Sequence, residues 1–282
     1  MTRKLCYLKL KRGELHLGMR TLILGVLNVT PDSFSDGGKY LDPDRAFARA
    51  LAIEEEGADI VDIGAESTRP GSERIQAAEE LRRLVPVLKR LRGQLRIPIS
   101  VDTYKADVAE RALELGAEII NDPSGLTWDP QIGKTVAASD AALVLNHMRG
   151  RPETWAKLGS LPDVMGAIVR DLEATVHRAR LAGVDRSRLI VDPGIGFGKR
   201  KEQNSEILAR LEQLARLDLP ILVGPSRKSF LAQPTEEATK FASAAAVTAA
   251  ILHGAHLVRV HDVAEMRVVA ALADEILKST TG

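Results

Sequence analysis

The fold of this chain is decided by the stretch of residues 22–38, which reads LILGVLNVTPDSFSDGG. Residues 22–27 form a short, almost wholly apolar run, which is typical of a strand buried on both faces in a parallel sheet. At Asn28 the run gives way to a loop of Thr, Pro, Asp, Ser and paired Gly. An apolar strand that delivers an amide and a hydroxyl-rich loop at its carboxyl end is a common way to build the rim of an active site.

The same pattern returns about seven more times along the chain. Strands are expected at residues 22–27, 58–63, 97–101, 118–120, 142–145, 189–191, 221–223 and 257–260. Helices are expected at residues 43–56, 74–92, 106–115, 131–138, 163–182, 202–217, 236–252 and 263–278. Helices of this length can connect parallel strands by right-handed crossovers. About eight strand–helix units predict an α/β fold of the (β/α)8 TIM-barrel type. A doubly wound open sheet is the alternative, but the chain shows no split into halves.

The chain divides into a short extension and one large domain. Residues 1–20 are expected to form the extension, and residues 21–282 a single barrel domain without an internal linker. Residues 5–17 alternate loosely around Lys11-Arg12-Gly13, which predicts a β-hairpin. In a barrel, such a hairpin would plug the end opposite the active site.

Composition excludes several classes of partner. The chain has 282 residues and a net charge of +1, with 39 basic and 38 acidic residues, so no global field favours nucleic acid or an anionic membrane. Cys6 is the only cysteine, so no intrachain disulfide can form, which fits a reducing compartment. No run approaches the ~20 apolar residues of a membrane span, and no signal-peptide core is evident. A cytoplasmic protein is therefore expected.

Polar residues collect where the predicted strands end, and a barrel brings its strand ends to one mouth. Asp102, Asn121 and Asp192 suit a flat heterocycle with two adjacent N–H donors, which a carboxylate can hold by paired hydrogen bonds. A strand-end Asp can equally cap the next turn. Beside Asp192, three glycines at 194, 196 and 198 are expected to keep the loop clear for a ligand.

Three cationic residues form a candidate anion clamp, namely Arg69, Arg259 and His261. Arg binds phosphate in a bidentate manner, and His adds a donor that can carry charge. Arg259 lies within a short apolar strand, where an unpaired charge would be costly. Lys228 is a hydrogen-bond donor for a ligand carbonyl, a Schiff-base nucleophile, or an ordinary solvated lysine. The six histidines show no transition-metal spacing, whereas magnesium shared with a substrate phosphate would leave little trace.

Assembled in order, these stretches resemble the dihydropteroate synthases, folate-pathway enzymes of the pterin-binding barrel family. The matching stretches are residues 28–38, 62–71 (DIGAESTRPG), 100–105 (SVDTYK), 120–126, 147–150, 192–199 (DPGIGFGK), 226–230 (SRKSF) and 258–263 (VRVHDV). Asn146 departs from the family, which usually has an apolar residue before His-Met.

The resemblance implies that 6-hydroxymethyl-7,8-dihydropterin diphosphate is joined to p-aminobenzoate and that diphosphate leaves. It implies that the pterin is held by Asp102, Asn121, Met148, Asp192, Gly224 and Lys228. It implies that the diphosphate is held by Thr68, Arg69, Arg259 and His261. It places Phe197 and Ser229 on the p-aminobenzoate side, where sulfonamides would compete, and makes Asn28 a ligand of Mg²⁺. By the same analogy, the catalytic residues are Arg69, Asp102, Lys228, Arg259 and His261, and the protein is a homodimer.

Three other functions remain open from the sequence. A pterin-binding methyltransferase would use the same barrel, but it would not need the Arg-Lys-Ser stretch at residues 227–229 or His261. A class I aldolase would use Lys228 as a Schiff base. A catalytically silent protein would bind pterin diphosphate without releasing diphosphate.

Overall fold

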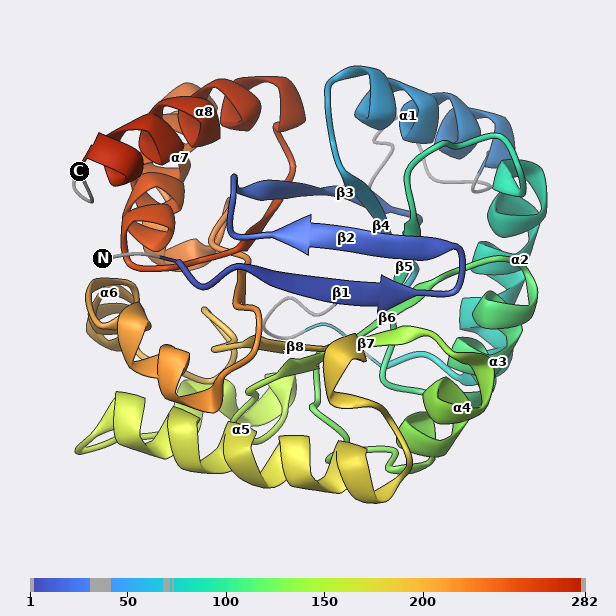
Figure 1. The fold of residues 1–282 in the computed structure, drawn as a ribbon, viewed down its shortest axis with the longest axis horizontal. Helices are drawn as coiled ribbons and strands as arrows, with labels where there is room; N and C mark the ends of the chain where they lie inside the picture. The colour runs from blue at the N-terminus through green and yellow to red at the C-terminus, as the bar shows by residue number, and fades with distance from the viewer. Residues whose placement is uncertain (1–2, 31–41, 68–71, 73, 280–282) are drawn as a thin grey trace.

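The fold is a barrel of eight parallel strands ringed by helices, seen in a computed structural model that describes residues 3–30, 42–67, 72 and 74–279 (Figure 1). The strands pair in the order β8-β7-β6-β5-β4-β3-β10-β9, and a parallel bridge from Val191 to Ile221 joins the two ends. Their bounds are β3 Leu22–Asn28, β4 Ile60–Gly64, β5 Ile99–Asp102, β6 Ile119–Asp122, β7 Ala142–Asn146, β8 Leu189–Asp192, β9 Leu222–Val223 and β10 Leu257–Val260. The predicted TIM barrel is confirmed.

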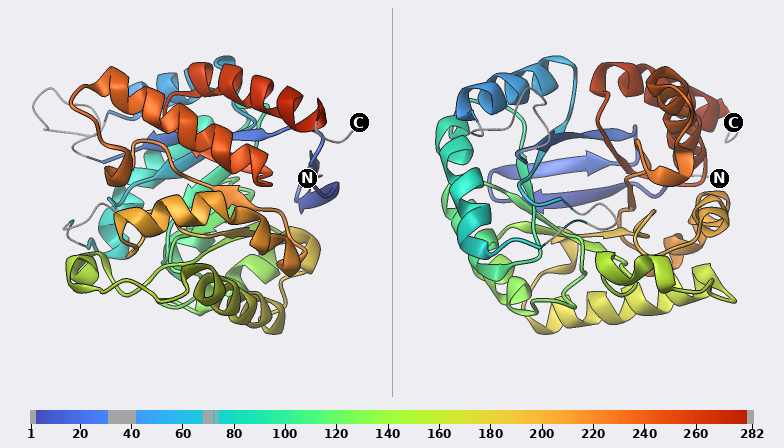
Figure 2. Two further views of the ribbon diagram at one scale, coloured as in Figure 1. Left: turned by 90° about the vertical axis from the view of Figure 1, so that its left-hand side faces the viewer. Right: turned by 180° about the vertical axis from the view of Figure 1, so that it is seen from behind.

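Helices alternate with these strands and cover the outside of the barrel, as the two views of Figure 2 show. Their bounds are α1 Pro43–Glu55, α2 Ala77–Leu91, α3 Ala106–Glu114, α4 Gln131–Ser139, α5 Val164–Leu181, α6 Lys201–Ala209, α7 Glu236–Leu252 and α8 Val263–Ser279. Helix α1 begins as the sequence predicts, because Asp42 accepts a hydrogen bond from the Asp44 N–H and Pro43 occupies the first turn. Within the described residues, no helix is both long enough and apolar enough to cross a bilayer.

The helix predicted at residues 202–217 is wrong in its second half. Helix α6 ends at Ala209, and a 3-10 helix follows at Leu211–Leu217. Leu211, Leu214 and Leu217 are buried at intervals of three residues, which is the repeat of a 3-10 helix rather than of an α-helix. A second 3-10 helix, Pro152–Lys157 between β7 and α5, was not predicted from the sequence.

Side chains of the barrel strands alternate between two cores. On β4, Ile60 belongs to a core inside the barrel, whereas Val61 and Ile63 belong to the larger core between the strands and the helices. Seven of the strands thus turn apolar side chains both outward to the helices and inward, whereas β5 contributes only to the outer core. The inner apolar set lies near the amino ends of the strands and comprises Leu22, Leu24, Ile60, Ile119, Ala142, Val144, Ile190, Leu222 and Leu257.

The N-terminal hairpin completes this inner core. Strands β1 (Cys6–Leu10) and β2 (Gly13–Leu17) pair antiparallel, and Figure 1 shows them lying across the end of the barrel. Leu8, Leu10 and Leu17 are buried against the inner apolar set. The hairpin therefore closes the end of the barrel at which the strands begin, as the sequence predicts.

Candidate active site

Above the inner apolar core, the inward positions of the same strands become polar. Two residues beyond Ile60 on β4 stands Asp62, and two beyond Leu257 on β10 stands Arg259. Because side chains alternate along a strand, a step of two residues keeps the same face of the barrel. We call the polar mouth the set of such residues at the carboxyl ends of the strands, namely Asp62, Ser100, Asp102, Asn121, Asn146, Asp192 and Arg259.

Arg259 joins three strands at the centre of the polar mouth. Its Nε donates to Oδ2 of Asp62 at 2.6 Å, and its Nη2 donates to Oδ2 of Asp102 at 2.8 Å. Asp62 is fully buried and also accepts from Ser100 Oγ at 2.6 Å and from Asn121 Nδ2 at 3.3 Å. Burial opposes the charge of Arg259, but the two carboxylates raise its pKa above the usual value. The guanidinium is therefore a permanent, precisely oriented cation.

Asn121 is oriented from two sides. Its Nδ2 donates to Asp62, and its Oδ1 accepts from Asn146 Nδ2 at 2.9 Å. The neighbouring Asp122 has a different role, because it accepts from the backbone N–H groups of Ser124 and Leu126 at 2.8 and 2.6 Å. Asp122 therefore caps a turn with both of its oxygens, whereas Asp102 and Asp192 face the barrel interior and, among the described residues, Asp192 accepts only one backbone N–H, from Gly194.

Three groups in or beside the polar mouth have pKa values far from their usual range. Burial raises the pKa of Asp192 to about 6, although the Gly194 N–H donates to its Oδ1 at 2.6 Å. Burial and the charge of Arg259 lower the pKa of Lys228 to about 8. Burial also raises the pKa of Asp102 well above its usual value, against the charge of Arg259. Shifts of this kind gather at functional sites, since they arise where charged groups are held in a dry hollow.

Lys228 reaches the site over an aromatic ring. Its Nζ lies 3.9 Å from the centroid of the Phe197 ring, which is a cation–π contact. Gly196 lies directly beneath it, since a Cβ there would come within 3.0 Å of Lys228 Cδ. Arg227, the preceding residue, is turned away, because its guanidinium binds the carboxylates of Asp262 and Glu236.

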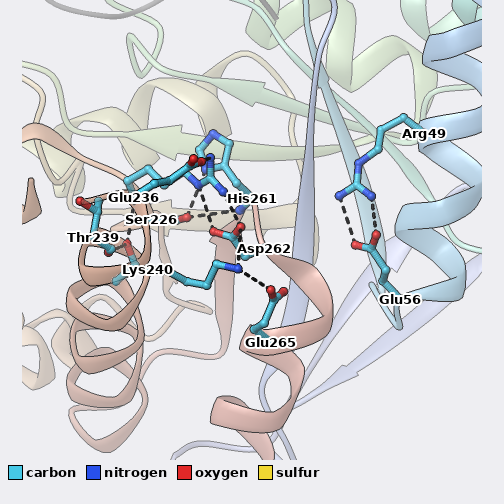
Figure 3. A network of polar contacts seen from close by, with 11 residues as sticks. Arg49, Glu56, Ser226, Glu236, Thr239, Lys240, His261, Asp262 and Glu265 are labelled. Carbon is cyan, nitrogen blue, oxygen red and sulfur yellow. Dashed lines mark hydrogen bonds and ion pairs between the residues drawn. The ribbon is translucent and has the colours of Figure 1, made fainter. Parts of the chain in front are cut away.

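His261 lies beside this outer ion-pair network, in which Lys240 pairs with Glu265 (Figure 3). His261 Nδ1 lies 3.1 Å from Ser226 Oγ, and Figure 3 shows the two side chains facing each other. Burial, followed by the charges of Arg259 and Arg227, lowers the pKa of His261 to about 3. The imidazole is therefore neutral at pH 7 in the free protein, and the expectation that it carries charge is revised for this state.

Comparison with known proteins gives a consistent answer. Residues 24–261 match the family described as pterin binding enzyme. The dihydropteroate synthase of Synechocystis is 44% identical over 263 residues, which cover 92% of this chain and 91% of the relative. The chain belongs to the dihydropteroate synthase family.

Solved structures of that family have the same architecture. The dihydropteroate synthase of Clostridium difficile, determined in the presence of pteroic acid, superposes with a TM-score of 0.86 at 43% identity and covers 92% of this chain and 98% of its own. The enzyme of Xanthomonas albilineans with 4-aminobenzoic acid gives a TM-score of 0.89 at 38% identity, covering 97% and 98%. The resemblance inferred from the sequence motifs is confirmed.

The structure brings several of the site residues named from the sequence to one mouth. Arg259 binds both Asp102 and Asp62, and Asp62 in turn binds Asn121, while Asp192 and Lys228 stand close to Arg259. Gly224 lies against Arg259, because a Cβ there would be 3.5 Å from Arg259 Cβ. The remaining predicted residues are placed as follows: Met148 half-buried after β7, Ser229 exposed at the start of a 3-10 helix, and Thr68 and Arg69 outside the described residues.

Sequence reasoning overlooked several residues that build the site. Asp62 was recognised only as a strand-end residue, and Ser100 and Asn146 were given no role. The missed signal is alternation, since Asp62 and Asn146 stand two residues after the inward residues 60 and 144, and Ser100 stands two residues before Asp102 on β5. Lys199 was also overlooked. Its buried Nζ donates to the carbonyls of His147, Pro193 and Gly194 at 2.7, 2.8 and 2.7 Å, joining the loops after β7 and β8.

The glycines after Asp192 have a different purpose from the one predicted. A Cβ at Gly194 would lie 1.9 Å from the carbonyl oxygen of His147, and a Cβ at Gly198 would lie 2.6 Å from that of Arg149. Both residues have positive φ, 67° and 71°. They therefore allow two loops to pack backbone against backbone. Only Gly196, beneath Lys228, faces a residue predicted to contact the ligand.

Proposed function

We propose that this chain condenses 6-hydroxymethyl-7,8-dihydropterin diphosphate with p-aminobenzoate to give 7,8-dihydropteroate and diphosphate. The observation that carries the proposal is the polar mouth of a closed barrel, in which Arg259 links Asp62 to Asp102 with Asp192 and Lys228 alongside. Such a site holds acceptors for a heterocycle and cations for a leaving diphosphate at one end of the barrel. Membership of the dihydropteroate synthase family supports it.

The pterin would be gripped by the inner part of the mouth. Asp192 is a buried acceptor suited to the adjacent N–H groups of the ring, and Asn121 is pre-oriented by Asp62 and Asn146. Lys228 would be a hydrogen-bond donor to the ring, whereas Asp192 is an acceptor, and the pKa of Lys228 is lowered. Met148 and Gly224 complete this contact set, as the family resemblance implies.

The reaction needs charge neutralisation rather than a side-chain nucleophile. The bond between the pterin methylene carbon and the diphosphate oxygen breaks, its electron pair leaves with diphosphate, and the amine nitrogen of p-aminobenzoate bonds to the carbon and then loses a proton. Arg259 and Arg69 would stabilise the negative charge that grows on the diphosphate, with Thr68 and a neutral His261 as further donors. Phe197 and Ser229 would line the side from which the amine enters.

We propose that Mg²⁺ binds beside Asn28. Gly64 leaves open the space between two oxygens, since a Cβ there would lie 3.8 Å from Asn28 Oδ1 and 3.9 Å from Asp102 Oδ2. In the described part of the chain, no cluster of three His, Cys, Asp or Glu side chains could hold a metal ion by itself. This suits Mg²⁺, which retains waters and takes substrate phosphate oxygens as ligands. When bound, the ion would offset diphosphate charge, with Asn28 as its protein ligand.

A diphosphate-release assay with both substrates tests the function directly. We expect release of diphosphate only when pterin diphosphate and p-aminobenzoate are both present, in equal amounts with dihydropteroate. Tight binding of pterin diphosphate without release on adding the amine would instead indicate a silent binding protein. Borohydride trapping of a carbonyl substrate on Lys228 would support the aldolase alternative. Methyl transfer from methyltetrahydrofolate would support the methyltransferase.

We propose in addition that the protein is a homodimer that pairs through α7 and α8. Four large apolar side chains on these two helices are exposed: Phe241, Val268, Leu272 and Ile276. The three on α8 are spaced by four residues and share one face. An exposed apolar stripe of this kind favours a partner surface. Light scattering should give twice the chain mass for the native protein and the monomer mass for Leu272→Glu.

A cytoplasmic location is proposed on chemical grounds. Cys6 is the one cysteine, and burial raises the pKa of its thiol, which keeps it protonated and slow to oxidise. A protein without a disulfide to protect suits a reducing compartment. Fractionation of cells that express the full chain would test this location.

A further inference from the structure

Trp155 stands directly behind Phe197. The 3-10 helix Pro152–Lys157, in the loop after β7, carries Trp155 to a point where its ring centroid is 5.6 Å from that of Phe197, with the ring planes tilted by 36°. This distance is within the range of favourable aromatic pairs. The indole is 7% exposed, although it lies in a loop. It is thus packed as firmly as a core residue.

The indole is locked in place by the loop that carries Phe197. Trp155 Nε1 donates to the carbonyl of Arg149 at 2.6 Å, and the Arg149 guanidinium donates to the carbonyl of Gly198 at 3.1 Å. A Cβ at Gly198 would lie 3.0 Å from Trp155 Cδ1, so the glycine allows the indole to pack closely against this loop. Because these contacts fix the indole from two loops, any ring that stacks against it is fixed as well.

Phe197 passes this constraint to the polar mouth. Its ring is only partly buried, and it carries the ammonium of Lys228 at 3.9 Å. The contacts therefore run in series from the locked indole to the phenyl ring and on to the lysine. Replacing Trp155 by a smaller side chain would leave a void behind Phe197, and the ring would lose its fixed orientation.

We propose that Trp155 is a positioning residue for the aromatic amine substrate, because it holds the Phe197 ring as a rigid wall for p-aminobenzoate. The proposal rests on the function proposed above, in which Phe197 faces that substrate. It predicts a larger effect on the amine than on the pterin, because Phe197 faces the amine directly whereas Lys228 is reached only through the phenyl ring. A general loss of stability would act on both substrates alike.

Kinetics of three variants test the proposal. For Trp155→Leu we expect the KM for p-aminobenzoate to rise about 5- to 10-fold, with the KM for pterin diphosphate and kcat within about 2-fold, in line with the strength of an aromatic pair. Trp155→Phe keeps a ring but loses the N–H donor, and it should restore most of the affinity. Trp128→Phe is the matched control, since Trp128 packs on Tyr104 and Arg74 instead. Equal changes in both KM values, or none in either, would overturn the proposal.

Fluorine NMR gives a readout that does not depend on turnover. The chain contains two tryptophans, so protein labelled with 5-fluorotryptophan has two resonances, which the two Trp→Phe variants assign. Adding p-aminobenzoate to the protein with diphosphate should shift the Trp155 resonance and leave that of Trp128 in place. An unmoved Trp155 resonance at saturating amine would refute the proposal. If the wild type forms no dihydropteroate, the proposed function fails, whereas normal turnover with unchanged kinetics in Trp155→Leu refutes only the role of Trp155.

Discussion

The two halves of the barrel interior are built on the same strands, yet they have opposite chemistry. In the half nearer the hairpin, inward positions such as Leu24 and Ile60 form a dry core. One inward position further along β4 the residue is Asp62, paired with Arg259. Two residues span about 6.6 Å of strand, so a single layer separates the apolar core from the charged site. Stability and chemistry are thus assigned to different layers of one structure.

The charged layer is costly to the fold. Removing Arg259 and two carboxylates from water costs free energy, which only their close hydrogen bonds offset. Apolar side chains of similar volume at such positions are often equally or more stabilising. The apolar layer, by contrast, stabilises the fold in proportion to its buried area. Substitutions in the two layers should therefore separate activity from stability.

The largest effect is expected from Arg259→Met. Loss of the guanidinium removes the cation nearest to Asp62 and Asp102, and we expect kcat to fall about 10³-fold, as for loss of one main charge-stabilising donor. The matched control is Arg12→Met, which removes an ion pair with the buried Glu118 near the hairpin end. Steady-state diphosphate release should change by less than about 2-fold in that control. Retention of a tenth of the wild-type kcat by Arg259→Met would contradict the assignment.

In the apolar layer, Leu24→Ala should affect stability instead. The side chain is buried against the hairpin core, and truncation of such a leucine costs about 3 kcal/mol of unfolding free energy. Urea denaturation measures that loss. The kcat of the folded variant should stay within about 2-fold of the wild type. A fall in kcat comparable to that of Arg259→Met would show that the two layers are not independent.

Asp192→Asn should change how the unfolding free energy depends on pH. The folded pKa of Asp192, about 6, lies above the unfolded value, so its contribution to stability is present at low pH and is lost as the pH rises through 6. The variant has no charge to bury, and its Oδ1 can still accept from Gly194. We expect equal stability near pH 3, below both pKa values, and an advantage of about 3 kcal/mol for the variant at pH 8.

Although Asp192→Asn should stabilise the fold at pH 8, it should weaken ligand binding. The variant loses the carboxylate that we assign to the pterin, so calorimetry should show weaker binding of pterin diphosphate, whereas Arg259→Met mainly slows diphosphate loss. Equal effects of both substitutions on binding and on turnover would contradict this division of roles.

The smallest effect is expected from Gly64→Ala. The added methyl would make only ordinary contacts, 3.6 Å from Asp102 Cβ, so the unfolding free energy should change by less than about 1 kcal/mol. It would occupy the space between Asn28 and Asp102, and the Mg²⁺ concentration for half-maximal turnover should rise. An unchanged Mg²⁺ concentration for half-maximal turnover would contradict the assignment of Asn28 as the metal ligand.

Much of this molecule could be predicted from the sequence, because strand-length apolar runs and helical segments alternate with clear boundaries. Asp102, Asn121, Asp192 and Arg259 could be placed at one mouth, since each lies at or near the end of a strand. Family resemblance added roles to these positions, but it gave no reason to examine Asn146, which departs from the family pattern.

The remainder depends on contacts between segments far apart in the chain. The Asn146–Asn121 hydrogen bond joins two strands, and the Lys199 contacts join two loops. No local pattern encodes such pairings. The 3-10 helix that carries Trp155 was missed for the same reason, because its position depends on a ring 42 residues later in the chain.

The hairpin has a consequence for the order of events. Leu8, Leu10 and Leu17 close one end of the barrel, and the polar mouth lies at the other, so we expect the substrates to enter there. Because Asp192 ends β8 and Phe197 lies in the loop that follows, a pterin held by Asp192 would lie deeper in the barrel than an amine beside Phe197. We therefore expect pterin diphosphate to bind first, and an amine that binds before it to hinder its entry. A barrel closed at one end would thus favour ordered addition of its two substrates.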